Sequence, residues 1–186
     1  MSGMPLAPLP PAGEDRPLRV SMVCSGNICR SPMAEVILRH LLDEAGVAGV
    51  EVESCGIGGW HVGDGADPRT VTMLRRHGYD GSAHRASQFD PRSFADLDLV
   101  LAADRGHLRA LQRAAGSEAD RAKVRLLREF DPQAVAAGTV EVDDPWYGGT
   151  ADFERCLLEV EAACRGLLDV LVAQPVAPTR PAQRAE

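Results

Sequence analysis

Two short, largely apolar stretches constrain the fold most strongly: LRVSMV at residues 18–23 and LDLVLAA at residues 97–103. Stretches of this kind are typical of strands that are buried on both faces, as in parallel sheets covered by helices. Residues 50–54 and 123–130 also have the pattern of strands. The sequence therefore predicts four strands around which the rest of the chain is arranged.

Helical patterns fall between and after these strands, at residues 32–45, 66–77, 104–115 and 151–172. The first of them has its apolar residues on one side, can accommodate Pro32 in its first turn and ends at Gly46. Regular alternation of strands and helices predicts an α/β domain, in which right-handed crossovers place helices on both faces of a parallel sheet. In such sheets ligands bind at the carboxyl ends of the strands, where the strand order reverses.

Composition favours one soluble domain. The chain has 186 residues, of which 45% are hydrophobic and 25% are charged. We expect residues 17–173 to form this domain and the proline-rich segments 1–16 and 174–186 to be disordered. The formal net charge of −7 argues against a broad surface for nucleic acid or for an anionic membrane. No segment has the length and apolar character that a membrane span requires.

The five cysteines are an odd number in a chain whose N-terminus lacks the pattern of a secretory signal. This fits reduced thiols in the cytoplasm better than a disulfide framework. The histidines and cysteines show no zinc-type spacing, so no metal site is expected. We therefore expect a cytoplasmic protein, monomeric, with neither a nucleic acid nor a membrane as its partner.

The segment CSGNICRS, residues 24–31, lies between the first strand and the first helix. A tight turn at a helix start can aim several backbone N–H groups at one point, where the helix dipole adds positive potential. Gly26 and Asn27 are residue types that tolerate left-handed backbone, and Arg30 carries a planar fork that matches two oxygens of a phosphate. The loop is therefore predicted to bind an anion.

The same positive potential acts on the thiol of Cys24, and it stabilises the charged form of sulfur. We expect a thiolate at neutral pH, with Ser31 donating a hydrogen bond that improves sulfur as a leaving group. The alternative for Cys24 is a buried apolar cysteine at a strand end. Cys29 remains open between core packing and a disulfide with oxidised Cys24. Cys55, Cys156 and Cys164 are expected in the core.

Nine of the residues in and after this loop resemble the signature of the low-molecular-weight protein tyrosine phosphatases: Cys24, Gly26, Asn27, Cys29, Arg30, Ser31, Pro32, Ala34 and Glu35. The resemblance implies a flavodoxin-like open sheet of four parallel strands in the order 2-1-3-4, with helices on both faces and no cofactor. It implies Cys24 as the nucleophile and Arg30 as the second catalytic residue of the loop. The other loop residues would bind substrate: Ser25, Gly26, Asn27, Ile28, Cys29 and Ser31.

A second segment, DDPWYGG at residues 143–149, resembles the acid loop of this family. A tyrosine phenolate leaves slowly unless an acid protonates it, and we expect Asp144 to be that acid and then the base that activates water. Asp143 is the rival, but the family pattern places the acid immediately before the proline. Trp146 and Tyr147 would form one wall of the substrate opening.

Three weaker matches complete the expected site. The segment 54–69 resembles the family's loop after the second strand, where Trp60 would form a wall opposite Trp146 and Tyr147 and favour aryl phosphates. The run HRASQ at 84–88 suggests that His84 supports Asn27, with Ser87 in place of the usual Arg. Asp104 would lie near Arg30, and His107 replaces the usual Asn of that motif.

These features predict a phosphatase that hydrolyses phosphotyrosine in proteins, and small aryl phosphates, through a cysteinyl phosphate. Phosphate and vanadate would inhibit it. Three alternatives are weighed against it. A protein-arginine phosphatase of this fold typically has Thr where Ile28 stands, and an arsenate reductase needs further cysteines, which residues 80–96 lack. A silent phosphate-binding module would not need Asp144.

Overall fold

The computed structural model describes residue 9 and residues 16–173, and at its centre lies a parallel sheet. Its strands are β1 (Leu18–Cys24), β2 (Val50–Gly56), β3 (Leu99–Ala102) and β4 (Val124–Leu126), in the order β2-β1-β3-β4. Val20 pairs with Val52 on one side and with Leu99 on the other. The predicted flavodoxin-like order 2-1-3-4 is confirmed, with β1 and β3 in the middle of the sheet.

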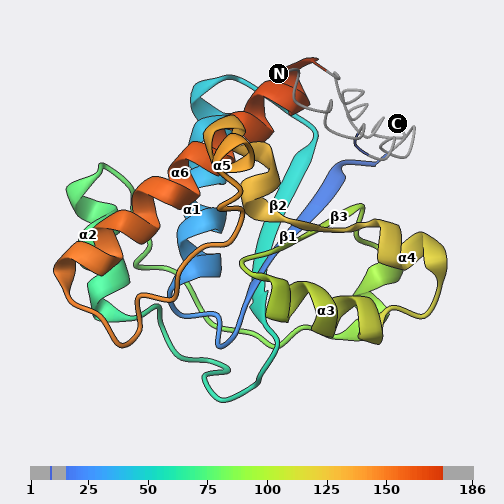
Figure 1. Ribbon diagram of the computed structural model, residues 1–186, viewed down its shortest axis with the longest axis horizontal. Coiled ribbons are helices and arrows are strands. Elements are labelled where there is room, and N and C mark those ends of the chain that lie inside the picture. Colours follow the sequence, from blue (N-terminus) through green and yellow to red (C-terminus); the bar gives the residue numbers. More distant parts are fainter. Residues whose placement is uncertain (1–8, 10–15, 174–186) are drawn as a thin grey trace, which may run out of the picture.

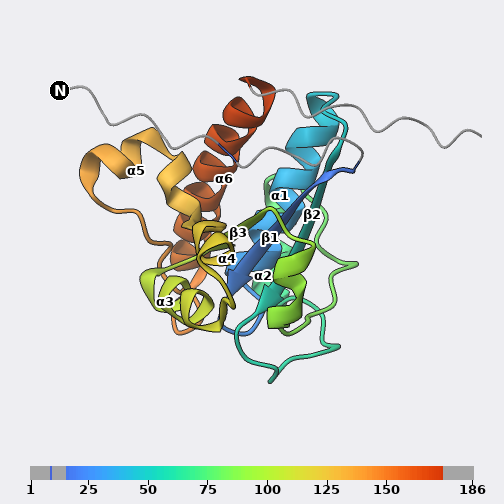
Figure 2. The same cartoon turned by 90° about the vertical axis from the view of Figure 1, so that its right-hand side faces the viewer.

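The long helices cover the two faces of this sheet, as Figures 1 and 2 show. Figure 1 places α1 and α6 on one side of the strands and α3 and α4 on the other. The helices are α1 (Arg30–Glu44), α2 (Pro68–Arg76), α3 (Arg105–Ala114), α4 (Glu118–Ala122), α5 (Pro132–Ala137) and α6 (Thr150–Ala173). Two 3-10 turns, η1 (Pro91–Ala95) and η2 (Leu127–Phe130), complete the described part of the chain.

Alternate residues of the central strands enter two separate cores, one under each layer of helices. In β3, Leu99 and Leu101 join the core formed with α1 and α6, whereas Val100 and Ala102 join the core formed with η1 and α3. All four side chains are buried. Burial on both faces explains why the third strand is an unbroken apolar run, as the sequence indicated. The sheet is therefore a rigid platform for the loops that follow its strands.

The predicted strand at 123–130 is wrong in its second half, because β4 ends at Leu126 and residues 127–130 form η2. The cause is tertiary: α6 crosses η2 so closely that a Cβ on Gly166 would lie 1.8 Å from the carbonyl oxygen of Phe130. Leu127 and Phe130, three residues apart, both face the core with α6. Among the described residues, η1, α4 and α5 were not predicted, since elements of this length carry little periodic signal.

The predictions of disorder for residues 1–16 and 174–186 lie outside the described residues, apart from Leu9 and Arg16. Arg16 is held by Asp98, whose two carboxylate oxygens each lie 2.7 Å from a guanidinium nitrogen. The same carboxylate accepts a hydrogen bond from the backbone N–H of Arg19 at 2.8 Å. These contacts fix the start of β1 against β3. The boundaries of the domain at residues 17 and 173 remain a prediction.

Replacing Gly166 with Ala should destabilise the protein, although this change stabilises most helices. The added methyl group meets the backbone of Phe130, which cannot move without shifting η2, so we expect a loss of about 1–3 kcal/mol in the free energy of unfolding. Urea denaturation measures it. Gly116→Ala is the control, because its methyl group meets nothing closer than 4.0 Å. A Gly166→Ala variant as stable as the parent would contradict the close crossing of α6 and η2.

Candidate active site

A cavity of about 320 Å³ opens at the carboxyl end of β1, where the 24–31 loop meets the 143–149 loop. It brings together ten of the predicted catalytic and binding residues with one residue that was not predicted, His61. The lining residues are Cys24, Ser25, Gly26, Ile28, Cys29, Arg30, Trp60, His61, Asp144, Trp146 and Tyr147. Asn27, Ser31 and His84 do not line the cavity. Asn27 and Ser31 belong to the loop, and His84 contacts the main chain of Asn27. The predicted cluster therefore exists as one site with a supporting layer.

The 24–31 loop passes directly into α1, which begins at Arg30 with Cys29 as its N-cap. No side chain caps the first N–H groups of this helix, so they remain directed at the cavity. Asn27 has φ of 57°, the left-handed conformation that the sequence predicted for it. Gly26 does not have a positive φ, so that part of the prediction is wrong. A Cβ at this position would lie 2.9 Å from the ring of His61, so a larger residue would require that ring to shift.

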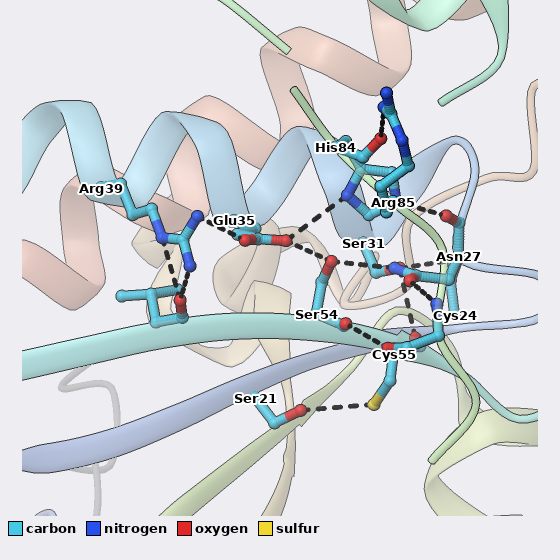
Figure 3. Close-up of polar contacts among 12 residues, drawn as sticks. Ser21, Cys24, Asn27, Ser31, Glu35, Arg39, Ser54, Cys55, His84 and Arg85 are labelled. Carbon is cyan, nitrogen blue, oxygen red and sulfur yellow. Dashed lines mark hydrogen bonds and ion pairs between the residues drawn. The ribbon is translucent and has the colours of Figure 1, made fainter. Parts of the chain in front are cut away.

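Behind the loop, a chain of hydrogen bonds leads from the sulfur of Cys24 into the protein (Figure 3). Ser31 Oγ lies 3.0 Å from Cys24 Sγ, and it accepts a hydrogen bond from Asn27 Nδ2 at 2.9 Å. The same amide donates to Ser54 Oγ at 2.8 Å, and Ser54 donates to Glu35. Because Asn27 donates to Ser31 Oγ, the single hydroxyl hydrogen can point either at the sulfur of Cys24 or at the carbonyl oxygen of Cys55, 3.3 Å away. The predicted contact between Ser31 and Cys24 is confirmed.

Besides the hydrogen bonds of its Nδ2, Asn27 has partners at its carbonyl oxygen and at its Oδ1. His84 Nε2 lies 2.8 Å from its carbonyl oxygen, and Ser87 N donates to Asn27 Oδ1 at 2.8 Å. The predicted support by His84 is confirmed, and it acts on the main chain of Asn27. Burial raises the pKa of Glu35, but hydrogen bonds from His84 and Ser54 more than offset this and leave that pKa below its usual value. A charged carboxylate therefore anchors the far end of the network.

The guanidinium of Arg30 is buried, at 4% exposure, and lies between two carboxylates. Nη1 donates to Asp104 Oδ2 at 2.9 Å and to the carbonyl of Val142 at 3.2 Å. Nη2 donates to Asp144 Oδ2 at 2.9 Å and to Ser25 Oγ at 3.3 Å. The predicted pairing of Arg30 with Asp104 is confirmed. Burial raises the pKa of Asp104, whereas the backbone N–H of residue 107 and Arg30 lower it, and the net shift is downward.

His107 contributes to the site in a way that sequence reasoning missed. Its Nε2 lies 2.9 Å from Ser25 Oγ, and its Nδ1 lies 3.1 Å from Asp104 Oδ1. Burial lowers the pKa of His107, and Arg30 lowers it further. Because Arg30 donates to Ser25 Oγ, the serine hydroxyl is left to donate to Nε2 of a neutral ring, whereas the buried Nδ1 has no hydrogen-bond partner among the described residues despite its closeness to Asp104. The one available signal was His107 standing three residues after Asp104, in place of the usual Asn.

The aromatic side chains stand at the rim of the cavity. Trp60 is 76% exposed and Tyr147 is 95% exposed, whereas Trp146 is partly covered at 38%. The ring of Trp146 lies 6.1 Å from that of His61, a residue that was not predicted for the site and that pairs with Asp64. Such a rim leaves room for a flat ring between Trp60 and the 143–149 loop.

Asp144 lies at the inner end of the 143–149 loop. Its Oδ1 accepts a hydrogen bond from the backbone N–H of Trp146 at 3.1 Å, while its Oδ2 contacts Arg30. Asp143, the rival for the acid, is exposed and does not line the cavity. The geometry therefore favours Asp144 over Asp143.

All five cysteines are free thiols and buried. Burial raises the pKa values of Cys29 and Cys55, each to about 12, and raises those of Cys156 and Cys164 as well. Cys29 lines the cavity beside Cys24, whereas Cys55 packs in the second core, so the prediction of a core position for Cys55 is confirmed. Within the described residues no group of three or more His, Cys, Asp or Glu could hold a metal ion, and no helix could cross a membrane.

The fold and the cavity together define the class. A four-stranded parallel sheet in the order β2-β1-β3-β4, with a Cys-x5-Arg loop at the carboxyl end of β1, is the arrangement of the small α/β protein-tyrosine phosphatases. Residues 19–177 match the family described as low molecular weight phosphotyrosine protein phosphatase. The chain belongs to this family.

Curated relatives match most of the chain. A low molecular weight protein-tyrosine-phosphatase of Streptomyces coelicolor is 58% identical over 151 residues, which are 81% of this chain and 91% of the relative. A low molecular weight phosphotyrosine protein phosphatase of Sus scrofa is 38% identical over 152 residues, 81% of this chain and 93% of the relative.

Solved structures agree. A protein tyrosine phosphatase from Entamoeba histolytica has a TM-score of 0.79 at 27% identity, covering 84% of this chain and 98% of its own. YfkJ from Bacillus subtilis has a TM-score of 0.79 at 31% identity, covering 87% and 99%.

Replacing His107 with Asn should make folding less sensitive to acid. Because the pKa of His107 is lowered in the folded protein, the unfolded chain takes up the proton first as pH falls below about 6.5. The parent should therefore lose stability from about pH 6.5 downward, until the pH passes the folded-state pKa and the loss levels off. The His107→Asn variant should lack this pH-dependent loss of stability. Urea denaturation at pH 7.5, 6.5 and 5.5 measures it, and equal slopes against pH would contradict the assignment.

Proposed function

We propose that this protein hydrolyses phosphotyrosine in proteins, and small aryl phosphates, through a covalent cysteinyl phosphate. One observation carries the proposal: Cys24, Arg30 and Asp144 face the same cavity, from a loop and a segment that are more than 100 positions apart in the sequence. Membership of the family supports it, as does the printed name of the Streptomyces coelicolor relative, a protein-tyrosine-phosphatase. No cofactor takes part.

Cys24 is the nucleophile in this mechanism. The start of α1 and the guanidinium of Arg30 supply positive potential, and Ser31 supplies a hydrogen bond at 3.0 Å, so that sulfur is held as a thiolate. The thiolate attacks phosphorus, a sulfur–phosphorus bond forms and the bond to the phenolic oxygen breaks. The backbone N–H groups of residues 25–30, together with Arg30, stabilise the negative charge of the transferring phosphoryl group.

Asp144 supplies the proton that the leaving phenolate needs. Its Oδ2 accepts a hydrogen bond from Arg30 Nη2 at 2.9 Å, and both residues line the cavity. A phosphate dianion that replaces Asp144 on Arg30 would leave the carboxyl group beside like charge, which favours its protonated form. The proton passes to the leaving oxygen. The resulting carboxylate then takes a proton from the water that attacks the phosphocysteine, which releases inorganic phosphate and restores the Cys24 thiolate. Protonation of this kind typically gives about 10²–10⁴-fold in rate.

The rim selects the substrate class. Trp60, Trp146 and Tyr147 flank the opening above Cys24, and walls of this depth fit an aryl phosphate better than the shorter phosphoserine. Ile28, which lines the cavity, lacks a hydroxyl group, and this favours phosphotyrosine over phosphoarginine. Of the cysteines, only Cys24 and Cys29 line the cavity, which counts against the thiol relay of an arsenate reductase. Phosphate and vanadate would act as inhibitors. We propose that the protein works in the cytoplasm as a monomer.

Cys24→Ser should abolish turnover, because an alcohol is not ionised near neutral pH. We expect hydrolysis of phosphotyrosine peptides to fall by at least about 10³-fold, while inorganic phosphate still binds. Steady-state hydrolysis of matched phosphotyrosine, phosphoserine and phosphoarginine peptides measures both rate and selectivity. Cys156→Ser is the control, because this buried thiol on α6 contacts Met33 and does not line the cavity. A Cys24→Ser variant with the parent's rate would refute the nucleophile, and preference for phosphoarginine would refute the substrate class.

Asp144→Asn should harm poor leaving groups most. Phenyl phosphate needs a proton on its leaving oxygen, whereas a nitrophenolate departs more readily without one. We therefore expect kcat/KM for phenyl phosphate to fall by about 10²–10⁴-fold and kcat/KM for p-nitrophenyl phosphate to fall much less. Asp143→Asn is the matched control, because the exposed carboxylate one residue earlier lies outside the cavity. The same loss for both substrates would remove Asp144 from the role of proton donor.

A further inference from the structure

The two halves of the site are held together by a segment that the proposed mechanism does not use. The 143–149 loop is not part of the sheet, and it has to keep Asp144 in register with the 24–31 loop. Asp67 and Arg69, at the start of α2, lie between these loops. Asp67 is the N-cap of α2, and Pro68 is the first residue of this helix.

Asp67 connects this segment to the 24–31 loop. Its backbone N–H donates to the carbonyl oxygen of Ile28 at 2.9 Å. Its side chain is largely buried and accepts three hydrogen bonds from Arg69: from the backbone N–H at 2.8 Å, from Nε at 3.0 Å and from Nη2 at 2.8 Å. Burial raises the pKa of Asp67, but these contacts with Arg69 lower it overall. The guanidinium is thus fixed in orientation by a carboxylate that is itself fixed to the 24–31 loop.

Arg69 connects the same segment to the 143–149 loop. Its remaining terminal nitrogen, Nη1, donates to the carbonyl oxygens of Trp146 at 3.1 Å and Gly148 at 3.3 Å. Its guanidinium lies over the ring of Phe153, 4.5 Å from the centroid, and 5.5 Å from that of Trp146. The backbone N–H of Trp146 is the group that binds Asp144 Oδ1. Residues 146–148 therefore accept hydrogen bonds from Arg69 through two carbonyl oxygens and bind Asp144 through the backbone N–H of Trp146.

We propose that Arg69, oriented by Asp67, is a positioning residue that sets Asp144 over the phosphate-binding loop. The inference rests on the proposed role of Asp144 as proton donor. Arg69 does not line the cavity, so it acts on the reaction through the loops that it joins, and of these the 143–149 loop carries Asp144. The planar fork is essential, because it bonds a carboxylate along one edge while its free nitrogen bonds two carbonyls. A lysine has one nitrogen and cannot form this set of contacts.

The test compares Arg69→Met and Arg69→Lys with the parent, using a series of aryl phosphates of increasing leaving-group pKa. Displacement of a catalytic group by about 1 Å can cost about 10²-fold. We expect kcat/KM to fall by about 10–100-fold for phenyl phosphate and by less than about 3-fold for p-nitrophenyl phosphate. The inhibition constant of inorganic phosphate, which depends mainly on the 24–31 loop, should change by less than about 2-fold. Arg76→Met is the matched control, an exposed arginine on the same helix.

A double-mutant cycle shows whether Arg69 acts through Asp144. In an Asp144→Asn background, Arg69→Met should lower kcat/KM for phenyl phosphate by less than about 2-fold, because the acid that it positions is absent. Additive losses would overturn the proposal, as would equal losses for all leaving groups or parent-like activity of Arg69→Lys. If Arg69→Met fails to fold, as thermal unfolding would show, Arg69→Lys carries the comparison. The single variant Asp144→Asn tests the proposed acid separately. If its loss in kcat/KM is the same for all leaving groups, Asp144 is not the proton donor, whatever the Arg69 variants show.

Discussion

The buried guanidinium of Arg30 is the group on which the rest of the site depends. A cation at 4% exposure is stable only where hydrogen bonds and opposite charges replace its water. Here the partners come from three places: Asp104 after β3, Ser25 in its own loop, and Val142 with Asp144 before α6. Satisfying one side chain thus forces the ends of β1 and β3 and the approach to α6 to meet at one point. The cavity is where they meet.

On the other side of the cavity, the charge to be stabilised is the negative charge proposed for the sulfur of Cys24. The proposed thiolate of Cys24 would need hydrogen-bond donors beside a hydrophobic core, and most donors at a helix start belong to the backbone. Ser31 adds a hydroxyl, and Asn27 donates a hydrogen bond to its oxygen from a left-handed position that only a few residue types adopt readily. The network ends on Glu35, a buried carboxylate that remains charged because His84 and Ser54 donate to it. Anion binding at Cys24 is therefore supported by groups up to one helix turn behind it.

The sequence predicted those parts of the structure that depend on short-range pattern. The strands at 18–23 and 97–103 followed from apolar runs, and the role of Asn27 followed from its tolerance of positive φ. Contacts across the fold had no such signal. The turn at 127–130 exists because α6 crosses it at Gly166, and no periodicity within eight residues reveals a helix that arrives 36 positions later. His61 and Arg69 likewise acquire their partners only when distant loops come together.

The two loops of the site differ in how strongly they are held, and this difference suits the chemistry. The 24–31 loop is continuous with β1 and α1, and its side chains at positions 24, 27, 30 and 31 are all buried. The 143–149 loop carries Asp144, 44% exposed at its side chain, and Tyr147, almost fully exposed. Segments with few buried contacts open most easily, so under the proposed function the loop that would admit a protein-bound phosphotyrosine is the one that can yield. The loop that stabilises charge in the transition state gains from rigidity, since donors already in place need no rearrangement during the reaction.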